Sequence, residues 1–319
     1  MTIRYLHGVQ GQVSWGVEGT AYTKATTVTN VFGLVGGSIQ WPTANPLSAE
    51  PTAGHRRAPY LHAREQYDHS FSVGYKVQGG ALLPWACALG ASDAISGTGY
   101  TGFKYSEADR LPTITVEHDQ KDANLQEFFV GCKSDLRLSA KQGEALQATQ
   151  DFVAASRSIT AGTPSFPEIS IPTIDPYMFW QTGIVTLKDG STVDKVASVS
   201  GFDLGWKNGL EAKNAGGGRD AYYVVENEVA GRYDMKLTIT PTDKTFYDLA
   251  VANNASIDVE IPLIRTGAST AAATDAIIID LLDCQIIDAP IPLTEKGEVQ
   301  SEITIVPLET EIYQRIPSA

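Results

Sequence analysis

One phrase occurs twice in this chain and restricts the folds open to it. Residues 66–73 read QYDHSFSV and residues 232–240 read RYDMKLTIT, so a Tyr-Asp pair leads each time into alternating apolar and polar side chains. Alternation with a period of two predicts a β-strand with one buried and one polar face. The second copy would bury Met235, Leu237 and Ile239. The fold must therefore hold the same half-buried strand twice.

Other segments recur in the same order around this phrase. The matched pairs are GGSIQW and GFDLGW (36–41, 201–206), long polar stretches (42–59, 207–221), apolar runs with helical spacing (81–89, 245–252), strands (111–118, 255–265), and a Cys-containing strand, turn and last strand (128–153, 277–306). Repetition of this kind predicts duplicated modules. We expect a mainly β fold with short helices: two mostly β modules in tandem, each with one short helix. The first would span residues 1–155 and the second 178–319, joined by a Pro-, Ser- and Thr-rich linker at 156–177.

Composition narrows the function classes. Hydrophobic residues make up 43% and charged residues 19%, as in folded proteins. The net charge of −13 argues against a protein that grips nucleic acid, which needs a basic face. The longest apolar stretch, 79–91, is shorter than the roughly 20 residues that span a bilayer, and the N-terminus has no signal-peptide pattern, so no membrane partner is expected.

A search for chemistry gives no candidate site. Cys87, Cys132 and Cys284 have no close pairing, which predicts buried thiols without a disulfide or zinc site. The run Glu117-His118-Asp119 fits a turn at a strand end better than an acid/base group. We therefore expect no catalytic, metal or cofactor site and favour assembly or binding over catalysis.

Three further segments carry a family resemblance. The segment 175–212 runs from Pro and aromatic residues through a hairpin to a strand that ends in Lys-Asn-Gly-Leu-Glu, VSWGVEGTAYTKAT occupies 13–26, and Lys-Gly-Glu at 296–298 precedes a strand. Together they resemble the tail tube (major tail) proteins of long-tailed phages. The first half departs from the pattern, since Trp41 is followed by Pro42.

The resemblance implies that the chain holds two tandem tail-tube-like β-sandwich or barrel modules, each with one flanking helix, and it also implies an assembly. Six tail tube modules form a ring, so a two-module chain would form a homotrimeric, pseudo-hexameric ring. Rings would stack into a hollow tube that conducts DNA during ejection and meets other tail proteins at its ends. The chain would be part of the virion tail, synthesised in the host cytoplasm, with DNA passing through it without specific contacts.

The same reasoning assigns candidate residues. The long loops would contact the neighbouring ring through Trp41, His55, Arg56, Arg57, Trp206, Asn208, Glu211 and Arg219. The polar faces of the repeated strand would line the lumen through Ser70, Ser72, Lys236, Thr238 and Thr240. The net charge predicts an acidic lumen, to which DNA does not adhere.

Three alternatives remain at this point. A tail terminator or distal tail-tip protein would share the fold but would not polymerise without limit. A carbohydrate- or receptor-binding β-sandwich would need an exposed aromatic cluster, which Trp41, Trp85, Trp180 and Trp206 could supply. A hydrolase with unrecognised catalytic residues is the third.

Overall fold

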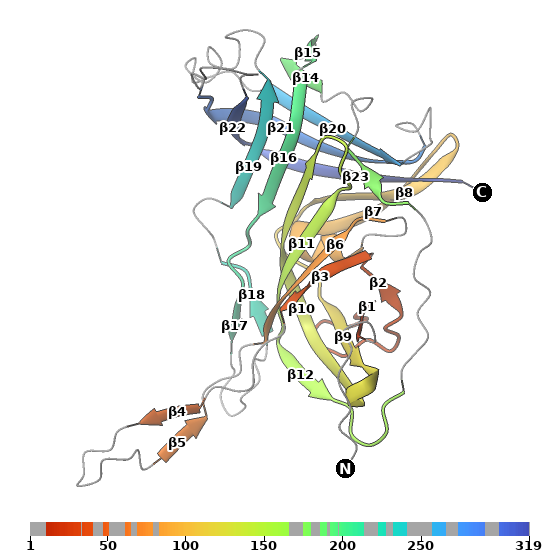
Figure 1. The fold of residues 1–319 in the computed structure, drawn as a ribbon, viewed down its shortest axis with the longest axis vertical. Coiled ribbons are helices and arrows are strands. Elements are labelled where there is room, and N and C mark those ends of the chain that lie inside the picture. Colours follow the sequence, from red (N-terminus) through yellow and green to blue (C-terminus); the bar gives the residue numbers. More distant parts are fainter. Residues whose placement is uncertain are drawn as a thin grey trace.

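The computed structural model describes most of the chain. The described residues are 11–32, 34–40, 47–50, 61–64, 69–78, 83–165, 175–179, 186–189, 192–196, 198–213, 223–227, 232–240, 257–265, 274–290 and 300–318. Their structure is dominated by antiparallel β-strands, which confirms the predicted mainly β fold (Figure 1).

The elements divide at the middle of the chain. The strands of the first half are β1 (Gly11–Val17), β2 (Asn30–Val31), β3 (Leu34–Gln40), β4 (Leu47–Glu50), β5 (Leu61–Arg64), β6 (Ser70–Lys76), β7 (Gly90–Gly97), β8 (Tyr100–Glu107), β9 (Ile114–Gln120), β10 (Leu125–Lys141), β11 (Gln147–Val153) and β12 (Ser156–Ile159). The described helices are η2 (Leu83–Trp85), α1 (Ala86–Leu89) and η3 (Lys121–Ala123). The strands of the second half are β13 (Tyr177–Met178), β14 (Thr186–Asp189), β15 (Thr192–Val196), β16 (Ser198–Trp206), β17 (Glu211–Lys213), β18 (Tyr223–Val225), β19 (Tyr233–Thr240), β20 (Ile257–Arg265), β21 (Ala276–Asp288), β22 (Ser301–Val306) and β23 (Glu309–Pro317).

One sheet runs through both halves. Its order is β3-β6-β11-β10-β16-β19-β22-β21, and we call it the shared sheet. The first four strands belong to the first half and the last four to the second. The strands β3, β6, β11 and β10 of the first half therefore correspond, one by one and in the same order across the sheet, to β16, β19, β22 and β21 of the second half.

Two further sheets show the same correspondence. The first-half sheet has the order β2-β1-β9-β10-β12, and the second-half sheet begins β15-β14-β20-β21-β23. The second-half sheet then continues through β8 and β7, which come from the first half. Within the part of the chain that the structure describes, two small two-stranded sheets, β4-β5 and β17-β18, are not paired with the strands of the closed barrel.

Strands β10 and β21 each belong to two sheets and change sheet after a cysteine. Cys132 still pairs with β9 and Lys133 already pairs with β11, while Cys284 pairs with β20 and Gln285 with β22. The residue before each cysteine has a positive φ, 71° at Gly131 and 49° at Asp283. A left-handed residue at a bulge bends a strand, and this bend lets one strand serve two sheets.

The core between the sheets is apolar and aromatic. Trp85, on the helical segment Leu83–Leu89, is fully buried, and its indole N–H donates to the hydroxyl oxygen of Tyr75 at 2.9 Å. The Tyr75 hydroxyl in turn donates to Oε1 of Gln150 at 2.8 Å. A buried hydroxyl with both roles filled avoids the cost of an unsatisfied polar group. This segment confirms the helix predicted at 81–89, and residues 245–252, where the second helix is predicted, lie outside the described residues.

Two local predictions need comment. The Glu117-His118-Asp119 run is not a turn: β9 continues to Gln120, because the run pairs with β1 on one side and β10 on the other. The first four residues of the predicted linker form β12, which pairs with β10. The three cysteines are buried and unpaired, as predicted.

Candidate assembly surface

The polar face of the shared sheet contains all five residues predicted to line a lumen. In β19, Met235, Leu237 and Ile239 are buried while Lys236, Thr238 and Thr240 are partly exposed. In β6, Ser70 is exposed and Ser72 partly exposed, between buried neighbours. The predicted faces of both strands are confirmed, and the polar side chains share one face of one sheet.

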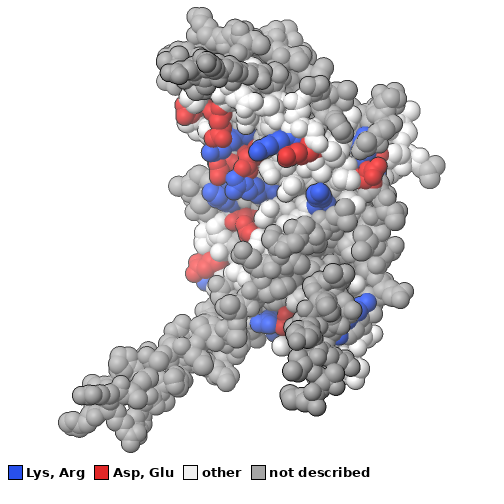
Figure 2. Space-filling view, in the orientation of Figure 1, with Lys and Arg blue, Asp and Glu red and all other residues white. Residues whose placement is uncertain are grey.

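This face carries charges of both signs. By the alternation of burial and the strand register, its described charged side chains are Asp135, Asp151, Asp203, Asp234, Asp288 and Glu302 on one hand and Lys76, Arg137, Lys141 and Lys236 on the other. The chain's negative charge is therefore not concentrated on the described part of this face. Blue and red atoms lie side by side in Figure 2 where Figure 1 places β16 and β19.

Ion pairs cross between neighbouring strands of this face. Arg137 on β10 donates to both carboxylate oxygens of Asp203 on β16, with 2.6 Å between Nε and Oδ1. Lys236 on β19 donates to Glu302 on β22 at 2.9 Å. The Arg137–Asp203 pair joins the two halves of the chain, and its bidentate geometry favours one register between them.

The seam between the halves has three layers. The first is the pairing of β10 with β16, from Leu136–Trp206 to Lys141–Gly201. The second is the pairing of β8 with β23, by which a first-half hairpin extends the second-half sheet. The third is the β17–β18 hairpin, which lies on the first half beside β10 (Figure 1).

Polar contacts hold the β17–β18 hairpin in place. The carbonyl oxygen of Val224 accepts hydrogen bonds from Nζ of Lys133 at 2.9 Å and from the hydroxyl of Tyr22 at 3.1 Å. The carboxylate of Glu226 accepts from Nζ of Lys133 at 2.6 Å and from the backbone N–H of Leu111 at 3.1 Å. Burial alone would raise the pKa of Glu226, but these donors outweigh it and lower the pKa. The Glu226 carboxylate is thus charged at neutral pH and binds the first half electrostatically.

Asn208 fixes the start of the same loop. Its Nδ2 donates to the carbonyl oxygens of Ala88 and Ser134, both at 2.9 Å, and its backbone N–H donates to Oδ1 of Asp135 at 2.8 Å. The side chain is buried. Burial raises the pKa of Asp135, and the Asn208 N–H partly offsets this rise. One side chain of the second half therefore satisfies two backbone acceptors of the first.

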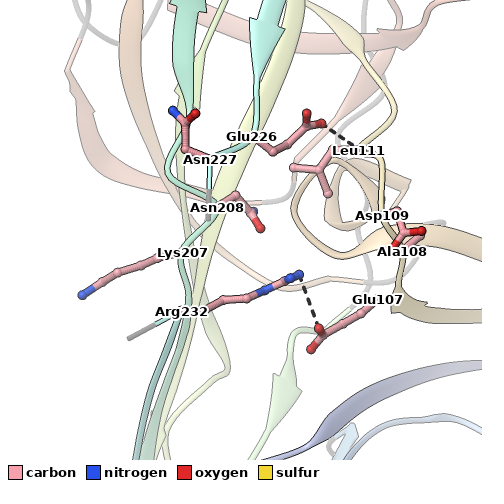
Figure 3. A pocket seen from close by; sticks show the side chains of 9 residues that line it. All are labelled: Glu107, Ala108, Asp109, Leu111, Lys207, Asn208, Glu226, Asn227 and Arg232. Atoms are coloured by element: carbon pink, nitrogen blue, oxygen red, sulfur yellow. Dashed lines mark hydrogen bonds and ion pairs between the residues drawn. The ribbon is translucent and has the colours of Figure 1, made fainter. Parts of the chain in front are cut away.

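A cavity of about 570 Å³ lies between the same segments (Figure 3). Its wall on the first-half side contains Glu107 and Asp109, and its opposite wall contains Lys207, Glu226 and Arg232. Arg232 reaches across to Glu107 at 3.3 Å. Because this ion pair joins Glu107 of the first half to Arg232 of the second, the cavity is part of the seam between the halves.

Comparison with known proteins identifies the chain. A family model described as phage tail tube protein matches residues 8–309, nearly the whole length. The chain belongs to this family. No curated protein matches the chain. Membership makes it a structural component of the virion tail, and the family is not one of enzymes.

The structure locates only some of the loop residues predicted for this tail tube protein. Trp206 is fully buried, and its indole N–H donates to Oγ1 of Thr310 at 3.3 Å. Asn208 is buried at the seam, and Glu211 is exposed and paired with Lys213. These contacts lie within one chain. The remaining loop residues of that prediction lie outside the described residues: Trp41, His55, Arg56, Arg57 and Arg219.

The seam residues Tyr22, Lys133 and Glu226 were not found from the tail tube sequence. The one signal for Lys133 was its place after Cys132 in an apolar run, FFVGCKSDL, where a lysine needs a partner. The exposed aromatic cluster of the carbohydrate-binding alternative loses two members, because Trp85 and Trp206 are both fully buried. Within the described residues, no group of His, Cys, Asp or Glu could hold a metal ion, and no helix is long and apolar enough to span a bilayer.

Proposed function

We propose that three copies of this chain form a closed ring of six modules, and that stacked rings form the hollow tube that conducts DNA during ejection. The observation that supports it is the doubled strand order of the shared sheet. Strand β10, last of the first four, pairs with β16, first of the second four. The chain thus contains one junction between two successive modules, consistent with duplication at residues 1–155 and 178–319.

The same junction can recur between copies. Among the described residues, β3 and the Gln285–Asp288 end of β21 have no outer partner in the shared sheet. An open strand edge invites pairing with another chain. If β21 of one copy pairs with β3 of the next, each contact repeats the β10–β16 junction and the ring has no open edge. The modules then succeed each other around the ring with alternating intrachain and interchain seams.

In this ring the polar face of the shared sheet lines the lumen. Its side chains are hydroxyls and charges of both signs, several of them paired across strands. DNA passing through such a lumen meets small polar groups and no continuous basic surface, so it has no high-affinity site. Stacking of identical rings is a head-to-tail contact, which forms open filaments. Other tail proteins would then bind at the two ends.

Electron microscopy and analytical ultracentrifugation of the purified protein test this proposal. We expect trimeric rings, and tubes at high concentration. Single rings that never stack would favour a tail terminator or tail-tip protein, and a persistent monomer would refute the ring.

An edge variant tests the pairing itself. Ile287 is the bulged residue of β21 without a register partner on β22, so Ile287→Pro falls at a position where the regular pairing with β22 is already interrupted. We expect this variant to remain monomeric while its urea midpoint stays close to wild type. Rings formed as readily as by wild type would show that β21 is not the pairing edge.

A further inference from the structure

The β4–β5 and β17–β18 hairpins occupy equivalent places in the two halves. Each is a two-stranded antiparallel sheet, inserted between β3 and β6 in the first half and between β16 and β19 in the second. The β17–β18 hairpin lies against the first half of its own chain. Within the described residues, β4 and β5 pair only with each other, and Figure 1 shows them well away from the barrel.

The surface beneath β17–β18 also has an equivalent in the second half. It contains the segment of β10 that follows Cys132, where the Lys133 residue is only 6% exposed because β18 covers it. The equivalent segment of β21 follows Cys284, after the same positive-φ bulge. There Gln285 is exposed and Ile287 is 64% exposed. The covered surface of the first half therefore corresponds to a bare surface in the second half.

The charges in the sequence that connects β4 to β5 are complementary to those on the bare segment of β21. Residues 51–60, which connect β4 to β5, include His55, Arg56 and Arg57 and no Asp or Glu. The bare part of β21 carries exposed Asp283 and Asp288. Opposite charges on two surfaces steer them together and fix their register.

We propose that the β4–β5 hairpin of one copy docks on the Asp283–Asp288 segment of β21 in the next copy of the same ring. The contact would repeat, between chains, the seating of β17–β18 on β10 within a chain. The inference rests on the proposed ring. It differs from the sequence prediction for His55, Arg56 and Arg57, which placed these residues against a neighbouring ring.

The interchain seam needs this hairpin more than the intrachain seam does. Within a chain, β8 also pairs with β23 across the seam. In the second half only residues 253–256 separate the predicted helix from β20, so the sequence leaves no room there for a hairpin like β7–β8. The interchain seam therefore has two layers where the intrachain seam has three, and the β4–β5 hairpin supplies one of the two.

A charge exchange tests the docking. We expect Arg56→Glu with Arg57→Glu to raise the protein concentration at which rings form by roughly tenfold, measured by sedimentation, and Asp288→Lys to restore much of the loss. The matched control is Lys121→Glu with Lys213→Glu, the same charge change at two lysines outside the seam cavity and the proposed docking surface; Lys121 is exposed and the Lys213 side chain is 42% exposed. This control should form rings at a concentration within about twofold of wild type.

Each other outcome overturns a distinct part of the inference. Normal rings that fail to stack in the double arginine variant would place the hairpin between rings. Loss of rings without rescue by Asp288→Lys would put the docking surface elsewhere. Failure of the wild-type protein to form rings would refute the ring itself and the docking with it.

Discussion

Replacing Asn208 by alanine tests whether this residue joins the two halves of one chain. In the structure its Nδ2 donates to two buried carbonyl oxygens, those of Ala88 and Ser134. Alanine removes both donors and leaves both acceptors without these partners, while the backbone N–H can still donate to Asp135. The strand and its register need not change, so the effect should be confined to lost hydrogen bonds.

The magnitude follows from those two bonds. Each buried hydrogen bond contributes about 0.5–1.5 kcal/mol, and an acceptor left unsatisfied is at the upper end. We therefore expect Asn208→Ala to lower the free energy of unfolding by about 2–3 kcal/mol. Asn208→Asp should cost more, because it also places a negative charge beside two carbonyl oxygens and the Asp135 carboxylate.

Urea unfolding followed by tryptophan fluorescence measures this, since Trp206 lies two residues away in the same seam. The control is Asn227→Ala in the same loop, whose side-chain bonds to Gly209 and Glu211 are exposed and should contribute less than about 0.5 kcal/mol. If Asn208→Ala unfolds within 0.5 kcal/mol of wild type but no longer forms tubes, its role lies between rings and the intrachain assignment is wrong.

Four further results are expected. Glu18→Gln should destabilise the monomer by about 2–4 kcal/mol in urea unfolding. The Glu18 carboxylate accepts hydrogen bonds from two backbone N–H groups and two hydroxyls. An amide has only one oxygen, so it must leave one of these N–H groups, such as that of Gly131, without an acceptor. Burial, followed by the nearby Glu117 charge, raises the pKa of Asp119 to about 7, so its contribution to stability is present below pH 4 and is lost as the pH rises through 7. Asp119→Asn should therefore stabilise the protein by a few kcal/mol at pH 8 and have little effect at pH 4. Equal effects of the substitution at both pH values would contradict this. Asp203→Asn with Glu302→Gln should increase retention of duplex DNA by assembled tubes at low salt, in a filter-binding assay, because it frees two cations on the proposed lumen face. Rings should separate into folded monomers at lower urea than that which unfolds the chain, so sedimentation and fluorescence should show two transitions and not one.

Strands and their buried faces could be predicted from the sequence, but the strand that lies beside each of them in the sheet could not. The alternation in RYDMKLTIT predicted that Met235, Leu237 and Ile239 are buried, and they are. Nothing in that period states which strand lies beside which, so the β10–β16 pairing could not be predicted. Pairing partners are chosen by the geometry of the whole sheet, which local patterns do not record.

Polar residues at the seam were hidden for a related reason. Asn208 lies at the start of the polar, glycine-rich stretch 207–221, and Glu226 lies shortly after it. This stretch has the composition of a solvated loop, and only the fold shows that both residues contact another part of the chain. Glu117 and Asp119 were interpreted as part of a turn at a strand end because adjacent side chains there point in different directions. The structure buries both carboxylates in β9, which is costly. The cost of burying the Glu117 carboxylate is partly compensated by Gln126, whose side-chain N–H donates to it.

In the proposed ring, joining two modules in one chain allows the intrachain and interchain seams to differ. A ring of single modules must use one interface at every position, so any element that strengthens one seam strengthens all of them. In this chain the β7–β8 hairpin pairs with β23 at the intrachain seam, while the second half has no sequence for its counterpart. In that proposed ring, the intrachain seam can be permanent and the interchain seam reversible. In the proposed assembly, a monomer whose strand edges pair only weakly stays in solution until it binds the end of a growing tube. The stability of the folded chain and the onset of assembly are then set by different contacts.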